Sequence, residues 1–330
     1  MLVIGAGPIG LETAAVLTAE GLTVQVVDSG PLGSTIVRTF PPHTRFFTSP
    51  ERLSLYGLAI APVHQEKLTG EEYLAYLRQY VATHDLRVDT YTEVVSGSRA
   101  PVRVVGRTLA GVQRQYAAST LVLATGGTDR PRRLGVPGED LPHVRSHLGD
   151  AHRYAGRRVV IVGGRNSAVE SALRCYRVGA QVHLVHRQEH IHDRVKFWLR
   201  PEVQSLLEEG AIIGHMPSTV VAITPEEVVL SDGARIAADD VVLQIGYEQD
   251  GALFEMFGLP CEGERDAPVV DQVTMRAAEG VYVVGTATAG TQARFEVFIE
   301  NSHDHPLRVA AALAGRAAPP PRPVRPIPEI

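Results

Sequence analysis

The chain has 330 residues, of which 44% are apolar and 21% charged, the composition of a globular protein long enough for two domains. Its formal net charge of −5 gives no electrostatic argument for nucleic acid binding. No apolar run reaches the ~20 residues that span a bilayer. The two cysteines, Cys175 and Cys261, imply no disulfide framework, and the first predicted strand follows Met1 too closely for a signal peptide. We therefore expect a cytoplasmic protein with no membrane partner.

Residues 2–28 predict a strand, a glycine-rich turn, a helix and a second strand. Gly5 permits the tight turn, Gly7 lets the backbone approach a pyrophosphate, and Gly10 lets the helix pack closely on the strand. The helix N-terminus offers N–H groups to phosphate. Asp28 ends the second strand, where a carboxylate accepts hydrogen bonds from ribose hydroxyls. The spacing predicts a bound dinucleotide, contacted by Gly5, Gly7, Pro8, Ile9, Gly10 and Asp28.

The following segment carries fewer signals. Residues 31–62 are rich in Pro, Ser and Thr and contain the pair Phe46–Phe47. Residues 68–85 predict a helix, because apolar residues recur at helical spacing. Two or three short strands follow, and the last ends in Thr125 and Gly126. This turn suits close approach of a cofactor; the alternative is a plain tight turn into the Pro- and Arg-rich linker of residues 128–142.

The same strand–turn–helix–strand unit occurs a second time at a constant offset, so that Val3 aligns with Ile161 and Asp28 with His186. Its turn begins Gly163-Gly164 and continues with Arg165 in place of the middle glycine. A Cβ there holds the backbone farther from a pyrophosphate, although the guanidinium can bind phosphate itself. Asn166 follows, and Ser167 can cap the helix or bond to phosphate.

The end of the second strand distinguishes the two copies. A carboxylate repels a 2′-phosphate, whereas His186 and Arg187 attract one. Arg194 and Lys196 lie just beyond and complete a predicted phosphate clamp, which favours NADP(H) over NAD(H). The alternative is an exposed basic loop without a ligand. The residues predicted to contact this nucleotide are Gly163, Gly164, Arg165, Asn166, Ser167, His186, Arg187, Arg194 and Lys196.

Two further strands are predicted at residues 240–246 and 281–285, and a last helix from about Ala293. The strands ending in Gly126 and Gly246 bracket the second unit. We therefore expect an inserted domain: residues 1–130 and 247–330 form the first domain, residues 131–246 the second, and residues 317–330 a Pro-rich tail. The alternative is two domains in succession. Either arrangement is α/β, with two Rossmann-like dinucleotide-binding domains.

Two dinucleotide sites in one chain indicate a flavoprotein that is reduced by a nicotinamide. If NADPH occupies the second site, FAD fits the first, because its flavin accepts two electrons. Many such flavoproteins pass electrons on through a C-x-x-C pair, which this sequence lacks. Cys175 aligns with Leu17 on the inner face of the helix and is expected in the core. We therefore assign no catalytic side chain and no metal site, and expect an external electron acceptor.

With these motifs the chain resembles the thioredoxin-reductase-like flavoproteins, and more closely the bacillithiol-disulfide reductases. The resemblance covers nearly the whole chain and is carried by the turn GAGPIGLETA, residues 43–49, the unit GGRNSAVESA, residues 196–198 and residues 298–301. It implies NADPH-dependent, FAD-linked reduction of a low-molecular-weight disulfide by a homo-oligomer.

The resemblance also implies flavin contacts. It places Phe46, Phe47, Thr48 and Ser49 along the flavin, and the final helix near Phe298, after the strand that ends at Gly285, towards the isoalloxazine. A helix N-terminus there would stabilise negative charge on the reduced flavin. The alternative for the two phenylalanines is an ordinary core pair. His43 is either a proton donor to product or a structural residue.

One departure from this group concerns position 9. Members proposed to work through a cysteine carry it where this chain has Ile9, so disulfide reduction through that residue is excluded. The acceptor is therefore a small molecule or a small redox protein. A ferredoxin- or flavodoxin-NADP reductase is a second interpretation, and a non-catalytic redox sensor that binds FAD and NADP(H) is a third. A flavin monooxygenase is disfavoured, because no further motif lies between the two fingerprints.

Overall fold

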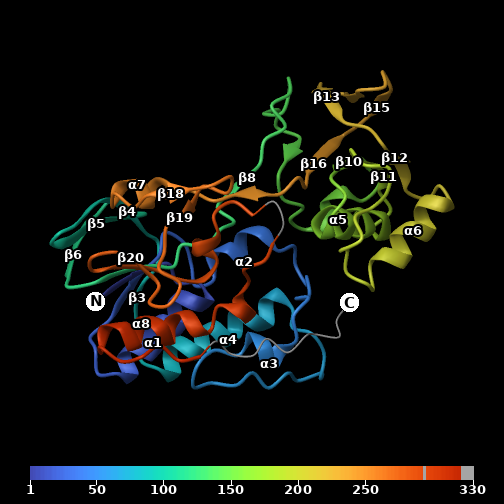
Figure 1. Cartoon of the computed structure of the whole chain (residues 1–330). Coiled ribbons are helices and arrows are strands. Elements are labelled where there is room, and N and C mark those ends of the chain that lie inside the picture. Colours follow the sequence, from blue (N-terminus) through green and yellow to red (C-terminus); the bar gives the residue numbers. More distant parts are fainter. Residues whose placement is uncertain (293–294, 321–330) are drawn as a thin grey trace. The chain divides into compact units, whose positions relative to one another are not determined.

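The computed structural model describes residues 1–292 and 295–320 (Figure 1). Most of the predicted tail, from residue 321 on, lies outside the described residues. Contacts between Cα atoms divide the chain into two compact units. The first unit comprises residues 1–38, 43–130 and the described residues from Tyr247 on, and the second comprises residues 39–42 and 131–246. Each unit is built on its own largely parallel sheet, which confirms the predicted α/β class.

The sheet of the first unit has the strand order β20-β21-β7-β1-β2-β3. Neighbouring strands are parallel except for the edge pair β20–β21. Every residue of β1, β7 and β21 is buried, the pattern of parallel strands that are covered on both faces. The strands are β1 (Leu2–Ile4), β2 (Gln25–Val27), β3 (Arg87–Asp89), β7 (Leu121–Leu123), β20 (Arg276–Ala278) and β21 (Val281–Val283).

Helices α1, α4 and α8 of the first unit pack together (Figure 1). Helix α4 confirms the helix predicted at residues 68–85. It begins after Thr69 because the Thr69 hydroxyl accepts a hydrogen bond from the Glu72 N–H while the Glu72 carboxylate accepts one from the Thr69 N–H. The helices of this unit are α1 (Pro8–Ala19), α2 (Ser34–Thr39), α3 (Pro50–Leu53), α4 (Gly70–Thr83), α7 (Ala252–Met256) and α8 (Asp304–Leu313).

A three-stranded antiparallel sheet packs against the first unit's core. It consists of β4 (Thr92–Arg99), β5 (Val102–Thr108) and β6 (Gln113–Ala118), and the side chains of Val102 and Val104 join Phe254 and Phe257 in one apolar cluster. Short strands complete the unit: β17 (Tyr247–Glu248), β18 (Cys261–Glu262) and β19 (Ala267–Pro268). The strand β8 (Arg130–Pro131) begins with the last residue of the segment 43–130 and ends with the first residue of the segment 131–246, which belongs to the second unit. Cys261 lies in the two-residue strand β18.

The sheet of the second unit is parallel throughout, with the order β12-β11-β10-β16-β9. Side chains of β10 alternate between two cores: Val159 and Ile161 face the cluster that contains α5, whereas Val160 and Val162 face the hairpin strands β13–β15. The elements are β9 (Val144–Arg145), β10 (Arg158–Val162), β11 (Gln181–Val185), β12 (Ile213–His215), β13 (Val220–Ile223), β14 (Glu227–Leu230), β15 (Arg235–Ala237), β16 (Asp240–Leu243), α5 (Asn166–Arg177) and α6 (Arg200–Glu208).

The prediction of a last helix from about Ala293 is wrong. Ala293 lies outside the described residues, and the helix α8 begins only at Asp304, after a three-residue 3₁₀ turn at Ile299–Asn301. Before this turn, backbone N–H groups donate to a side chain and not to helical carbonyl oxygens. The amide oxygen of Gln292 accepts hydrogen bonds from the N–H groups of Glu296 (2.8 Å) and Val297 (3.0 Å). Pro306 is tolerated because it lies in the first turn of α8.

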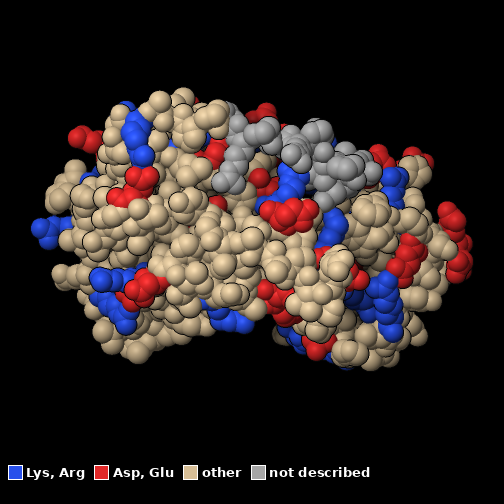
Figure 2. Space-filling view, turned by 90° about the horizontal axis from the view of Figure 1, so that it is seen from below, with Lys and Arg blue, Asp and Glu red and all other residues tan. Residues whose placement is uncertain are grey.

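Charged side chains of both signs are interspersed on one face of the molecule (Figure 2). On the face drawn in Figure 2, the coloured Lys and Arg groups lie next to Asp and Glu groups, and most of the face carries neither. Among the described residues, none of the helices combines the length and apolarity needed to cross a membrane.

Candidate nucleotide-binding sites

The first glycine-rich turn is closed on its inner side and open on its outer side. Gly5 has φ +112°, and a Cβ there would lie 2.3 Å from the Ala124 carbonyl oxygen. A Cβ on Gly10 would lie 2.0 Å from the Gly5 carbonyl oxygen. At Gly7, by contrast, a Cβ would meet nothing within 4 Å. Pro8 then begins α1, which has no side-chain cap. The turn therefore offers open space and uncapped backbone N–H groups, which fits a pyrophosphate.

Asp28 ties this turn to the end of β2. Its Oδ2 accepts a hydrogen bond from the Ala6 N–H (2.6 Å) and its Oδ1 one from the Gly30 N–H (2.7 Å). Burial raises the pKa of this carboxyl, while the two backbone donors and Arg38 oppose the rise. A hydrogen bond from the Ser34 side chain also lowers this pKa. Three of the carboxylate's four lone-pair sites are therefore used, and one remains for the predicted ribose contact.

Thr125 and Gly126 lie at the end of β7, beside the turn. Gly126 has φ +89°, and its carbonyl oxygen accepts a hydrogen bond from the side chain of Gln249 (2.8 Å). The Thr125 hydroxyl is buried and has no hydrogen-bond partner among the described residues. Since a buried hydroxyl without a partner is costly, Thr125 fits a contact with a bound cofactor.

The structure brings Ile9 and Gly285 together. Gly285 has φ +69°, and a Cβ there would lie 3.0 Å from Cβ of Ile9. Its N–H donates to Nδ1 of the buried His305 (3.0 Å). Burial lowers the pKa of His305 to about 4, with smaller effects of neighbouring charges. The end of β21 is therefore held beside the first fingerprint by a neutral histidine.

The segment 46–49 contacts the 3₁₀ turn near Phe298. The Thr48 hydroxyl donates to Oε1 of Glu300 (2.8 Å). Phe46 is buried and packs edge-on against Tyr73, with 5.0 Å between the ring centroids. It therefore packs as a core residue. Phe47 carries the Lys67 ammonium 4.8 Å above its ring, and Ser49 precedes α3. Phe298 is 41% exposed.

His43 lies apart from this packing. It is exposed, has a positive φ of 61°, and its N–H donates to Glu71. Its role as a proton donor stays a prediction.

The second turn has the same closed inner side. Gly163 has φ +139°, and a Cβ there would lie 2.4 Å from the Gln244 carbonyl oxygen. Ala168 replaces the third glycine. A Cβ on Gly164 would meet the ring of His186 at 2.4 to 2.5 Å, so the imidazole packs directly on the turn.

His186 differs from the prediction in its charge. The side chain is buried, and burial together with the charge of Arg187 lowers its pKa. It is therefore neutral at pH 7 and gives no positive charge to a phosphate clamp. Its Nε2 is buried with no hydrogen-bond partner among the described residues, which leaves one polar atom for a nucleotide.

The predicted arginines do lie together. Desolvation and the charges of Arg187, Arg132 and Arg194 lower the pKa of Arg165. The cluster of Arg132, Arg165, Arg187 and Arg194 is called the arginine cluster below. Mutual repulsion destabilises such a cluster and favours a bound anion. Arg132 was not among the predicted contacts; it lies in the Pro- and Arg-rich linker and approaches Gly246.

Lys196 is positioned differently from the arginines. It is buried, its ammonium lies 3.2 Å from Oε2 of Glu170 on α5, and its N–H donates to Oδ1 of Asn166 (2.7 Å). Both contacts tie the loop after β11 to the start of α5, where the exposed Ser167 follows Asn166. Its phosphate contact stays a prediction.

Neither cysteine has the surroundings of a redox thiol. Cys175 is buried in the core of the second unit, as predicted, and burial raises its pKa to about 12. Burial also raises the pKa of Cys261. Within the described part of the chain, no three His, Cys, Asp or Glu side chains are grouped to hold a metal ion.

Comparison with known proteins places this geometry in a family. Residues 2–285 match the family model described as pyridine nucleotide-disulphide oxidoreductase. Bacilliredoxin reductase Bdr of Bacillus subtilis is 32% identical over 96% of this chain and 97% of its own length. The solved bacillithiol disulfide reductase Bdr of Bacillus cereus is 31% identical, with a TM-score of 0.90 over 95% of this chain and 98% of that one. A ferredoxin–NADP reductase of Ignicoccus hospitalis is 26% identical over 87% of this chain and 89% of its own length.

These matches confirm the resemblance inferred from the motifs. They cover both glycine-rich turns and the strands that carry them. The chain belongs to the pyridine nucleotide-disulphide oxidoreductase family of FAD-dependent NAD(P)H oxidoreductases.

Proposed function

We propose that the protein oxidises NADPH in its second unit and transfers the electrons, through FAD held by its first unit, to an external acceptor. The observation that carries this proposal is the contrast between two otherwise matched turns. In the first, the Asp28 carboxylate accepts hydrogen bonds from backbone N–H groups; in the second, Arg165 of the turn belongs to the arginine cluster. Only the second arrangement suits the 2′-phosphate of NADP(H).

The residues that would hold FAD are those of the first turn. The open side of Gly7 and the uncapped start of α1 accommodate the pyrophosphate, Asp28 accepts from the ribose, and the buried Thr125 hydroxyl gains a partner. When bound, FAD supplies a group that accepts two electrons as a hydride and releases them again. The protein's part is to bind and orient both nucleotides.

The acceptor is reached without a protein thiol. Ile9 stands at the turn position, Cys175 is buried with a raised pKa, and no C-x-x-C pair exists in the sequence. A low-molecular-weight disulfide or a small disulfide-containing protein is the acceptor class that the similarity to the two Bdr proteins favours. A ferredoxin-type carrier is the second candidate, because it needs no cysteine in the reductase. A homo-oligomer is likewise part of the proposal.

The test is anaerobic reduction with NADPH, followed by a set of acceptors. A yellow protein whose flavin band bleaches within seconds of NADPH addition supports the oxidoreductase. Reoxidation by small disulfides, unchanged in Cys175→Ser and Cys261→Ser variants, supports direct disulfide reduction. Reoxidation by ferredoxin alone moves the assignment to electron transfer. A purified protein without flavin, or one that NADPH does not bleach, rejects the proposal in favour of a nucleotide-binding sensor.

A further inference from the structure

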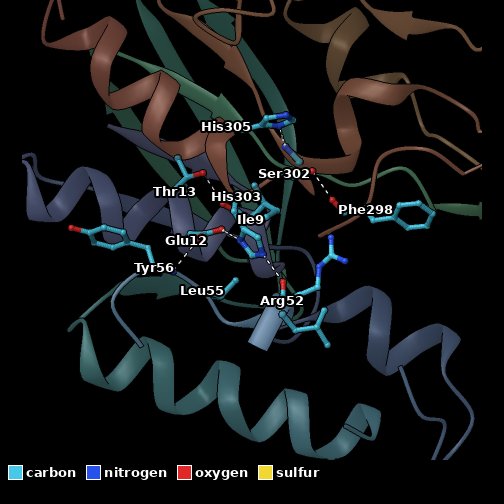
Figure 3. A network of polar contacts seen from close by, with 12 residues as sticks. Ile9, Glu12, Thr13, Arg52, Leu55, Tyr56, Phe298, Ser302, His303 and His305 are labelled. Carbon is cyan, nitrogen blue, oxygen red and sulfur yellow. Dashed lines mark hydrogen bonds and ion pairs between the residues drawn. The ribbon is translucent and has the colours of Figure 1, made fainter. Parts of the chain in front are cut away.

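A buried ionisable pair joins the beginning and the end of the first unit (Figure 3). Glu12 lies in α1 and is 0% exposed, and His303 directly precedes α8 and is 5% exposed. Nδ1 of His303 lies 2.8 Å from Oε2 of Glu12, and its Nε2 lies 2.8 Å from the Arg52 carbonyl oxygen. The other carboxylate oxygen of Glu12 accepts a hydrogen bond from the Tyr56 N–H (2.9 Å).

These contacts fix the number of protons in the pair. The Arg52 carbonyl oxygen can only accept, so Nε2 of His303 must carry a proton. The contact between Nδ1 and the Glu12 carboxylate needs a second proton, on either atom, because otherwise two lone pairs would face each other. The pair with both protons is neutral overall, and loss of the second, shared proton would leave an uncompensated buried charge.

The ionisable groups around the pair make their hydrogen bonds and ion pairs with other partners. None of them supplies the proton shared by Glu12 and His303. On α4, the hydroxyl groups of Tyr73, Tyr76 and Tyr80 each donate a hydrogen bond to a backbone carbonyl oxygen. Burial raises the pKa of all three, and the charge of Glu12 makes a smaller contribution in the same direction. On α8, Asp304 and Arg308 pair with each other, and His305 accepts from Gly285. Glu300 accepts the Thr48 hydroxyl.

The pair connects three segments that the resemblance places around the flavin. Glu12 lies one turn after Pro8 and Ile9 of the first fingerprint. Arg52 belongs to α3, which follows the segment 46–49. His303 ends the segment 298–303, within which the Ser302 hydroxyl donates to the Phe298 carbonyl oxygen (2.6 Å). Figure 3 shows His303 between Glu12 and Arg52, with Ile9 beside it.

We propose that Glu12 and His303 are positioning residues: through one shared proton they hold the segment 298–303 against α1 and α3, and so fix the protein side of the flavin pocket. The inference rests on the proposed function for its flavin part only. The proton count itself concerns this chain's own residues and is measured without turnover.

Glu12→Gln is a sharp test, because glutamine fits the same contacts without the shared proton. Its amide oxygen accepts from the Tyr56 N–H, and its NH₂ donates to Nδ1 of a neutral His303, whose Nε2–H still donates to Arg52. The variant keeps these contacts and lacks the shared proton. Glu51→Gln, on the exposed surface of α3, is the matched control.

The first measurement is the unfolding equilibrium of the first unit in urea, at fixed excess FAD, between about pH 5.5 and 7.5. In this window an unfolded glutamate is ionised, with a pKa of about 4.3, and the unfolded His303 titrates identically in both proteins. The folded native protein holds one proton more than folded Glu12→Gln. The ratio of unfolding constants, native over variant, should therefore rise about ten-fold per pH unit. The same ratio for Glu51→Gln should stay constant.

The second measurement is the visible circular dichroism of the bound flavin. At pH 7 the signal of Glu12→Gln should match the native signal, because glutamine keeps the contacts, whereas Glu12→Ala, which lacks the contact with His303, should change it. A pH-independent ratio of unfolding constants overturns the shared proton. A ten-fold slope together with a native flavin signal in Glu12→Ala overturns the positioning role. If the protein binds no flavin, the proposed function fails, while the slope, followed by far-ultraviolet dichroism, still decides the proton count.

Discussion

At the scale of single residues, His186 and Arg187 show how burial separates two neighbours that look alike in sequence. Both stand at the end of β11, where Asp28 stands at the end of β2. The His186 ring is buried on Gly164 and its pKa is lowered, whereas Arg187 is exposed and contributes to the arginine cluster. Selectivity for a 2′-phosphate should therefore depend on Arg187 and not on the charge of His186.

Replacing Arg187 by alanine tests this assignment. A hydrogen bond to a charged group contributes about 1.5–3 kcal/mol. The KM for NADPH should therefore rise roughly ten- to hundred-fold, since ~1.4 kcal/mol corresponds to a factor of ten. The KM for NADH should stay unchanged, because NADH lacks the 2′-phosphate. Steady-state kinetics with both coenzymes measures the two values.

The matched control is Arg235→Ala in the same unit. Arg235 pairs with Glu227 across two hairpin strands and is exposed. It should leave both Michaelis constants unchanged. Equal losses for NADPH and NADH in Arg187→Ala would show that the side chain supports the loop and does not recognise the 2′-phosphate.

At the scale of elements, the two helices that follow the turns differ in how closely they approach their strands. A Cβ at Gly10 would lie 2.0 Å from the Gly5 carbonyl oxygen, well inside van der Waals contact. The second unit already carries Ala168 at the aligned position, 3.0 Å from an added Cβ on Gly163. Helix α1 therefore has no room for a side chain at position 10, whereas α5 accommodates the methyl group of Ala168 at the aligned position.

The variant Gly10→Ala should lose bound FAD and stability. Overpacking costs typically 1–3 kcal/mol, and here the clash is with backbone, which cannot move without opening the turn. In Ala168→Gly the cost should be only about 1 kcal/mol, the usual penalty for glycine within a helix. Flavin content after purification and urea midpoints measure both effects. A Gly10→Ala protein that keeps its FAD and its midpoint would contradict the close approach of α1.

The turns and central strands could be predicted because their signals are local. Gly5, Gly163 and Gly126 have the positive φ angles that their turns require, and the apolar strands next to them are buried. The position of α8 could not, because side chains of Gln292 and Asn301 satisfy the preceding backbone in an irregular conformation. Such a competition between side-chain and helical hydrogen bonds has no periodic signature in the sequence.

The contacts between distant charged residues could not be predicted from the sequence either. Glu12 and His303 are separated by 291 positions, and Lys196 meets Glu170 across 26. Each looked like an ordinary charged residue in its own segment. Only the fold shows that Glu12 and His303 meet in the core and that Lys196 ties a loop to α5.

At the scale of the whole molecule, the chain consists of two units that use the same turn with opposite electrostatics. In the first unit the Asp28 carboxylate accepts backbone N–H groups of the turn. In the second unit Arg165 of the equivalent turn is close enough to Arg187, Arg194 and Arg132 of the linker for their charges to lower its pKa. Each unit should therefore respond to its own nucleotide, and the two responses should be separable along the chain.

Amide hydrogen exchange tests this division. Addition of NADP⁺ at about a hundred times its dissociation constant stabilises the binding-competent state by ~2.7 kcal/mol. Exchange should slow at residues 163–169 and 186–196, where the turn and the arginine cluster lie, and stay unchanged at residues 5–10 and 28–30. FAD added to flavin-depleted protein should give the opposite pattern. NAD⁺ at the same concentration should protect residues 186–196 less than NADP⁺, because those residues carry the arginines assigned to the 2′-phosphate. Protection of residues 5–10 by NADP⁺ would mean that the nucleotides are assigned to the wrong units, whatever the enzyme reduces.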